Sequence, residues 1–168
     1  MNRRGLLALV LIAAGTVHAQ NFPTRPIRWV VPFAAGGGAD VVGRPVALAM
    51  GELLGQPIVY DNRGGGNGMI AGEIVARAAP DGYTLLLGGP AILTANPHLY
   101  RKMPFDVEKD FVPITKIAGA PNVMGAHPGL PARNVQELID YAKTNPNKIN
   151  WASSGIGTGG HIAVELFM

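Results

Sequence analysis

The sequence contains no cysteine, and only 15% of its residues are charged. Without cysteine the chain can form no disulfide, no thiolate nucleophile and no cysteine-ligated zinc site, so its fold depends on its apolar core. Aromatic residues make up only 7%, and the formal net charge is +3. Lys and Arg are scattered rather than clustered, so we expect no nucleic-acid partner.

Long apolar runs are scarce as well. One runs from Gly5 to Gly15, after the basic pair Arg3 and Arg4. It is much shorter than the roughly 20 residues that a membrane-spanning helix needs. Val17 and Ala19 then occupy the two positions that signal peptidase reads. We therefore predict that residues 1–19 are a secretory signal peptide rather than a membrane anchor.

What the sequence does contain is glycine, with 23 residues, set between short apolar segments. Apolar strands that alternate with helices are typical of a parallel sheet covered on both faces. The ligand site of such a sheet lies outside the carboxyl ends of its strands. Glycine-rich loops fall at these ends, at 36–38, 64–68 and 88–90. We expect strands at 27–33, 57–61 and 83–87 and a helix at 70–79. Between the first two strands we expect a helix that Asp40 caps and Gly55 ends. The apolar face of this helix is expected to comprise Val42, Val46, Ala49, Met50 and Leu53.

The second half of the chain continues less regularly. We expect extended segments at 111–117 and 122–126, a helix that begins at Asn134 or Val135, and a short strand at 148–152. A last helix is expected over 161–168. Because the sequence stops inside this helix without a cap, we expect it to be truncated.

Two loop-to-helix junctions favour anion binding. The first turn of a helix has unpaired N–H groups and a partial positive charge, and glycine lets a ligand approach this backbone closely. Residues 36–38 and 153–160 have this form, and the hydroxyls of Ser153, Ser154 and Thr158 add donors. The alternative interpretation, that both are only tight turns, stays open at this point.

Other chemistries fit the sequence less well. No glycine loop has the lysine of a P-loop, and Ser153 and Ser154 lack the GxSxG pattern. Residues 155–160 match GxGxxG, which alone is a weak signal for a dinucleotide. Asp40 fits a helix cap better than a base, and His161 fits ligand contact and packing equally. We expect no cofactor and no metal, and an exported α/β hydrolase acting on a small anion is the alternative function.

A family resemblance joins these motifs. Residues 27–40, 55–68, 79–85, 96–100, 110–114, 127–128 and 153–161 resemble, in order, the Bug-type receptors of tripartite tricarboxylate transporters. The resemblance implies a two-lobed, periplasmic-binding-protein-like α/β fold with mainly parallel sheets. This chain would hold most of lobe 1 (residues 20–120) and an incomplete beginning of lobe 2 (residues 121–168).

The resemblance also implies a function and a site. The protein would be a periplasmic solute-binding receptor, not an enzyme, that captures a small carboxylate for a membrane permease or a sensor and is a monomer when full length. Ala34-Ala35 and Ala39 depart from the family pattern, and Ala39 removes a usual hydroxyl donor. The implied ligand-binding residues are Phe33, Ala35, Gly36, Gly37, Gly38, Ala39, Asp40, Ser153, Ser154, Gly155, Gly157, Thr158 and His161.

The signal motif generates the first testable prediction. Cleavage after Ala19 should give a mature chain that begins at Gln20. N-terminal sequencing of protein released from the periplasm checks this, and a periplasmic protein that still begins at Met1 would contradict it.

Overall fold

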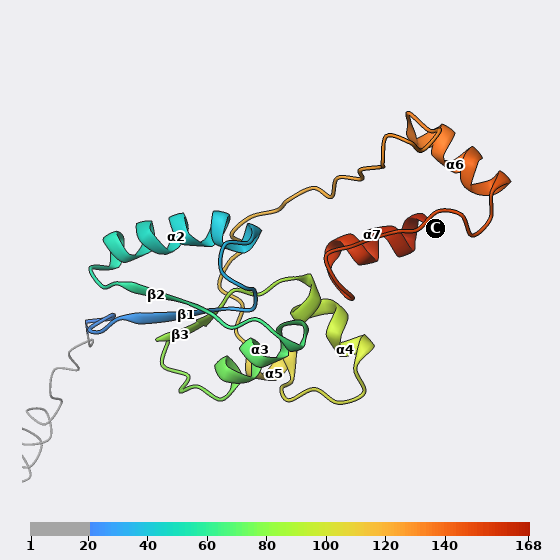
Figure 1. The fold of residues 1–168 in the computed structure, drawn as a ribbon. Coiled ribbons are helices and arrows are strands. Elements are labelled where there is room, and N and C mark those ends of the chain that lie inside the picture. The colour runs from blue at the N-terminus through green and yellow to red at the C-terminus, as the bar shows by residue number, and fades with distance from the viewer. Residues whose placement is uncertain (1–20) are drawn as a thin grey trace, which may run out of the picture.

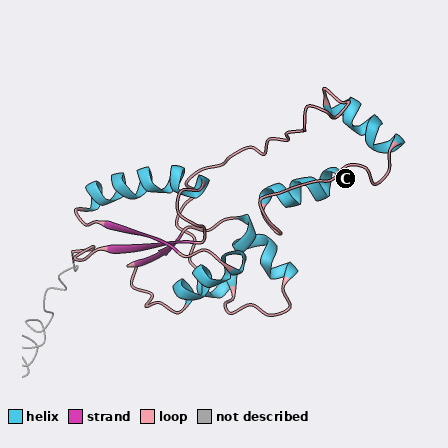
Figure 2. Ribbon diagram, in the orientation of Figure 1, coloured by secondary structure: helices cyan, strands magenta, loops and turns pink. Residues whose placement is uncertain are grey.

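The computed structural model describes residues 21–168, so the predicted signal peptide at residues 1–19 lies outside the described residues. A small sheet with helices on both faces forms the first part, and two further helices follow a long irregular segment (Figures 1 and 2). The elements are β1 (Ile27–Val31), α2 (Gly38–Leu54), β2 (Ile58–Asn62), η1 (Gly66–Gly68), α3 (Met69–Ala76), β3 (Thr84–Leu86), η2 (Ala91–Ala95), α4 (Asn96–Leu99), α5 (Val107–Asp110), α6 (Val135–Thr144) and α7 (Gly159–Phe167).

The sheet is parallel, as predicted, in the order β2-β1-β3. β1 lies in the middle and pairs Ile27 with Ile58 and Arg28 with Thr84. Four of its five residues are buried, with Arg28 the exception. This pattern follows from helices on both faces: α2 covers one, and α3 lies on the other (Figure 1). Each strand lies inside or within one residue of its predicted range.

The first helix begins earlier than predicted. Gly37 is its N-cap residue, so the expectation that Asp40 caps it is wrong. Asp40 lies in the first turn instead, because Gly38 and Ala39 already have helical geometry. Pro45 is accommodated inside the helix. Gly55 ends it in the left-handed conformation, with φ 67°, as predicted.

The predicted apolar face of α2 is only partly right, since Val46 and Met50 are half-buried but Ala49 is exposed. Its buried residues are Asp40, Gly43 and Ala47, whereas Val42 is 43% and Leu53 is 87% exposed. Small residues face the sheet because the helix packs closely over the aromatic ring of Tyr60 on β2. Several larger aliphatic residues of the helix, among them Val41 and Leu48, are exposed instead.

The large ring on β2 belongs to Tyr60. Its hydroxyl donates to the Ala39 carbonyl oxygen at 2.9 Å, and its ring meets Trp29 edge to face at 5.8 Å between centroids. A side chain at Gly43 would collide with it, since a Cβ there would lie 2.9 Å from Tyr60 Cε2. Glycine at 43 therefore sets the distance between α2 and the sheet.

The second half departs most from expectation. The strand expected at residues 148–152 is wrong, because these residues have no regular secondary structure. The segments at 111–117 and 122–126, expected to be extended, pair with no strand either. A strand needs a neighbouring backbone to pair with, and the only sheet among residues 21–168 is the one at β1. Val112 and Val123 are accordingly 87% and 89% exposed. The division into two lobes at residue 120 stays a prediction.

The last two helices begin with side-chain caps. Asn134 precedes α6 as predicted, and its side chain accepts from the Glu137 N–H at 2.9 Å. α7 begins at Gly159, two residues before the predicted start, because the Thr158 side chain caps it. Across residues 21–168, each helix is too short or too polar to cross a membrane.

The close packing at Gly43 gives the second prediction. Gly43→Ala should displace the Tyr60 ring and destabilise the fold by about 1–3 kcal/mol, as overpacked substitutions do. Gly38→Ala is the matched control, because it lies in the same helix and a Cβ there meets nothing within 4 Å. Denaturant unfolding of the full-length gene product measures both. Equal stability of the two variants would contradict the close packing.

Candidate functional site

Four loops converge on one small hollow at the carboxyl edge of the sheet. The first three follow β1, β2 and β3, and the fourth is the glycine loop that leads into α7. The hollow has a volume of about 140 Å³. Its position is the one that the parallel sheet predicts. The lining residues are Pro32, Phe33, Gly65, Asn67, Gly68, Gly89, Ala91, Ile92, Ser154 and Thr158.

A buried carboxylate shapes the first loop. Asp40 is only 6% exposed. Its Oδ2 accepts from the Gly36 N–H at 2.8 Å and from Arg44 Nε at 3.0 Å, and its Oδ1 accepts from Asn62 Nδ2 at 2.9 Å. Asn62 also donates to the Phe33 carbonyl oxygen at 3.0 Å. One side chain thus joins the loop after β1, the start of α2 and the end of β2.

The same hydrogen bonds change the electrostatics of Asp40. The Gly36 N–H and then the Asn62 amide stabilise the charged form, with a smaller part from Arg44, and together they lower the pKa of Asp40. Asp40 therefore keeps its charge at neutral pH and faces the loop that it orders. It accepts hydrogen bonds here, so it holds the loop and offers no donor to an anion.

The fourth loop is closed by Thr158. Its hydroxyl donates to the Gly155 carbonyl oxygen at 2.7 Å and accepts from Ser154 Oγ at 3.1 Å and from the His161 N–H at 3.3 Å. The hydroxyl proton is therefore already used within the loop. The donors that remain at this junction are the Ser153 hydroxyl, which only accepts from the Gly155 N–H, and the N–H groups of Gly159 and Gly160, which have no acceptor among residues 21–168.

His161 and Gly157 fix the other side of this loop. His161 Nδ1 accepts from the Gly157 N–H at 3.3 Å, and Nε2 lies 3.6 Å from Glu165 Oε1. Both ring nitrogens therefore have neighbours within the α7 region. Gly157 has φ 77°, and a Cβ there would lie 3.0 Å from both Asn67 Nδ2 and Leu99 Cδ1. The fourth loop thus packs directly on the first part of the chain.

The structure brings together only part of the predicted site. Among the predicted residues, Phe33, Ser154 and Thr158 line the hollow. The other predicted residues flank it: Ala35, Gly36, Gly37, Gly38, Ala39 and Asp40 in the first loop, and Ser153, Gly155, Gly157 and His161 in the fourth. The predicted set leaves out the loops after β2 and β3, although their glycines at the strand ends already marked them.

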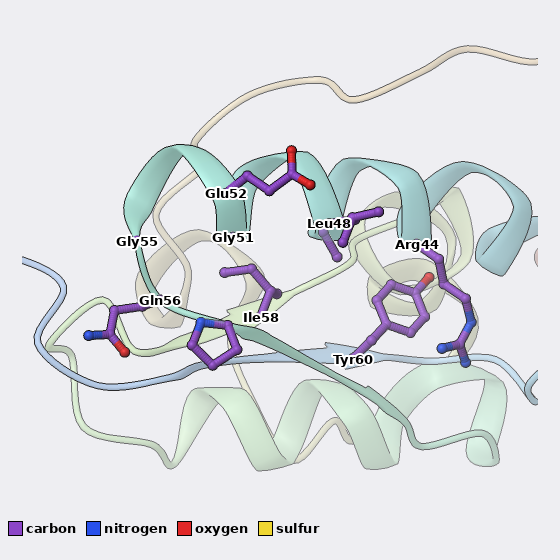
Figure 3. Close-up of a pocket in the computed structure, with 10 residues that line it drawn as sticks. Arg44, Leu48, Gly51, Glu52, Gly55, Gln56, Ile58 and Tyr60 are labelled. Atoms are coloured by element: carbon purple, nitrogen blue, oxygen red, sulfur yellow. The ribbon is translucent and has the colours of Figure 1, made fainter.

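A larger hollow of about 430 Å³ lies elsewhere, between α2 and the edge strand β2 (Figure 3). Figure 3 shows Tyr60 and Ile58 rising from β2, with Arg44 descending from α2 beside Tyr60. Its one basic side chain is engaged internally, since Arg44 bonds Asp40 and Asn62 and lies 4.7 Å from the Tyr60 ring centroid. It is also open to solvent and lies at the amino end of β2, beside Pro57 and Ile58, rather than at the carboxyl edge of the sheet. We therefore assign the candidate site to the smaller hollow.

The smaller hollow offers hydrogen-bond donors that carry no charge. None of its lining residues carries a charge. The first turn of α2 adds the N–H groups of Gly38 and Ala39, which have no acceptor among residues 21–168. Two helix N-termini beside the hollow and the side-chain amide of Asn67 in its lining can therefore meet an anion without any basic side chain.

Comparison with known proteins decides the family. The model of the tripartite tricarboxylate transporter family receptor matches residues 42–168. The chain belongs to this receptor family. A UPF0065 protein of Bordetella pertussis is a relative that is 45% identical over 164 residues, and the match covers 98% of this chain and 50% of the relative. The chain thus spans about half the length of the curated relatives it matches.

Solved structures agree with this membership. Rpa4515 of R. palustris, solved with adipate, has a TM-score of 0.80 at 40% identity, and the match covers 87% of this chain and 49% of that one. MatC of Rhodopseudomonas palustris, with bound malate, has a TM-score of 0.74 at 34% identity, with 86% and 49% covered. The periplasmic binding protein BugD has a TM-score of 0.67 at 38% identity, with 87% and 50% covered. The receptor family and the periplasmic-binding-protein-like α/β fold were therefore predicted correctly.

The Asp40 network of this receptor chain gives the third prediction. Because the pKa of Asp40 is lowered in the folded state, its contribution to stability is present above its unfolded pKa and is lost as the pH falls through the folded value. The midpoint of thermal unfolding of the wild type should therefore fall below about pH 4. Asp40→Asn should remove this part of the pH dependence and lower stability at pH 7.

The control is Asp140→Asn, a carboxylate on α6 whose removal leaves the first loop untouched. It should retain the wild-type loss of stability in acid. If Asp40→Asn and the wild type show the same pH profile, Asp40 does not hold the loop through its charge.

Proposed function

We propose that this chain is the amino-terminal part of a periplasmic receptor that captures a small carboxylate in the hollow between its four loops. The observation that carries the proposal is an uncharged hollow lined by residues of four loops, two of which lead into the N-termini of α2 and α7. The N–H groups of Gly38, Ala39, Gly159 and Gly160 are free among residues 21–168. They supply partial positive charge to an anion without a counter-ion.

The class of ligand follows from the donors and from the relatives. A carboxylate accepts several hydrogen bonds at once, and each bond to a charged group contributes about 1.5–3 kcal/mol net. Between two and four such bonds support micromolar binding, which corresponds to about 8 kcal/mol. Two neighbours of similar fold hold the dicarboxylates adipate and malate, so a dicarboxylate is the first ligand to test.

The structure supports ligand binding more than enzymatic catalysis. The predicted residues that could act as nucleophile or base are engaged elsewhere: Ser154 Oγ donates to Thr158, and His161 contacts Gly157 and Glu165. A Ser–His pair is not assembled among these residues, and the hydrolase alternative has no support from the family. The proposed receptor would be exported by its signal peptide and deliver its ligand to a membrane permease or a sensor.

The fourth prediction tests the anion site through Gly37. Gly37 has φ −81° and ψ 178°, which valine adopts readily, and a Cβ there comes no closer than 3.6 Å to the Ala34 carbonyl oxygen. Gly37→Val should therefore fold normally but obstruct the approach of a ligand to the start of α2. Calorimetry on the full-length gene product should show dicarboxylate binding lost or weakened at least tenfold.

The matched control is Gly125→Val, since a Cβ at Gly125 meets nothing within 4 Å and the residue lies outside the four loops. Its affinity should equal that of the wild type. The ligand panel comprises adipate, malate and citrate with their amides. Amides that bind as tightly as the acids would overturn the carboxylate proposal, as would full affinity in Gly37→Val.

Thr158→Ala gives a complementary measurement. Its hydroxyl closes the fourth loop rather than facing a ligand. The loss of this cap should still weaken binding by about tenfold, because the start of α7 becomes less ordered. The thermal midpoint should fall in the same variant. A lower midpoint distinguishes weaker binding caused by a less ordered loop from weaker binding caused by a lost hydrogen bond to the ligand.

A further inference from the structure

Asn67 stands out in the loop after β2. It has φ 54° and ψ 37°, a left-handed conformation that few residues other than glycine adopt. Its neighbours Gly65, Gly66 and Gly68 also have positive φ, so Asn67 carries the one side chain in a run of four such residues. A strained residue beside a hollow is a reason to look for a role in binding.

A buried partner fixes the orientation of this side chain. Asn96 is 0% exposed, and its Nδ2 donates to the Asn67 carbonyl oxygen at 2.9 Å. A backbone carbonyl can only accept, so the amide group of Asn96 must face it and the Oδ1 of Asn96 must face the Asn67 side chain. Asn67 Nδ2 then donates to that Oδ1 at 2.7 Å. The pair therefore holds the nitrogen of Asn67, and not its oxygen, in this position.

The side-chain amide of asparagine has two N–H groups, and the bond to Asn96 uses one. Asn67 is half-buried and lines the hollow together with Phe33, Ser154 and Thr158. Its Nδ2 lies beside the fourth loop, 3.0 Å from the place where a Cβ at Gly157 would stand. The second N–H is thus available at the point where the loop after β2 meets the fourth loop.

We propose that Asn67 is a ligand-binding residue whose second side-chain N–H donates to the bound carboxylate, with Asn96 as the residue that positions it. This inference rests on the proposed function and adds a third source of hydrogen-bond donors to the two helix N-termini. A side-chain amide is neutral, so it fits a site without basic residues. Because the donor is preoriented by a buried partner, little side-chain freedom is lost on binding.

Three variants of the full-length gene product test this role by calorimetry with adipate, malate and citrate. Asn67→Gly keeps the left-handed backbone and removes the donor, so affinity should fall about tenfold or more. Asn67→Asp keeps the size of the side chain and tolerates the same backbone, but places a carboxylate against the ligand, so its affinity should fall further than that of Asn67→Gly.

Asn147→Gly is the matched control. Asn147 is the other non-glycine residue with positive φ among residues 21–168, at 63°, and it is exposed after α6. The same chemical change there should leave affinity at the wild-type value. Thermal midpoints of all three variants report the structural cost separately from the binding cost.

The outcomes separate the inference from the proposed function. If the wild type binds acids over amides but Asn67→Gly binds as tightly as Asn147→Gly, the receptor proposal holds and the role of Asn67 is overturned. If Asn67→Asp binds better than Asn67→Gly, a carboxylate at position 67 does not repel the ligand, and the donor role of Asn67 is overturned. Should either variant fail to fold, the amide NMR signals of Asn67 in the labelled wild type decide: they must shift on addition of the dicarboxylate, and unmoved signals overturn the role.

Discussion

Parallel pairing of β1 between β2 and β3 is the constraint on which the rest of the structure depends. It places the carboxyl ends of all three strands at one edge, so the loops that follow them must meet there. A chain with no cysteine must hold those loops by packing, hydrogen bonds and ion pairs. The burial of β1 supplies the packing, and the polar groups of the loops supply the hydrogen bonds.

Asp40 and Asn96 act in the same way on two of these loops. Each is a buried polar side chain that bonds backbone groups of a neighbouring glycine-rich loop: Asp40 the N–H of Gly36, and Asn96 the carbonyl oxygen of Asn67. Glycine makes such loops adaptable, and a fully bonded buried group restores a single conformation. The cost of burying these groups is offset because their polar atoms all have partners among residues 21–168.

The sequence predicted the sheet, the glycine loops and the family, since these depend on local patterns of apolar residues and glycine. It was only partly right about the buried face of α2, because Gly43 packs against the Tyr60 ring on another element, which helical periodicity does not report. It also failed at residues 148–152, which have strand-like composition. A strand exists only where a partner backbone is present, and composition alone does not supply one.

The candidate site was predictable by position more than by residue. The strand-end rule located the first three loops and the loop-to-helix pattern located the fourth, but Asn67 looks in the sequence like one more polar residue among glycines. Its importance depends on a bond to Asn96, 29 residues away, and on the approach of Gly157 from the fourth loop. Such long-range contacts also explain why Gly157 cannot carry a side chain: it is the point at which the fourth loop rests on the first part of the chain. The donors of the site are therefore placed by contacts between loops, and a change at any of these contacts should act on binding before it acts on the sheet.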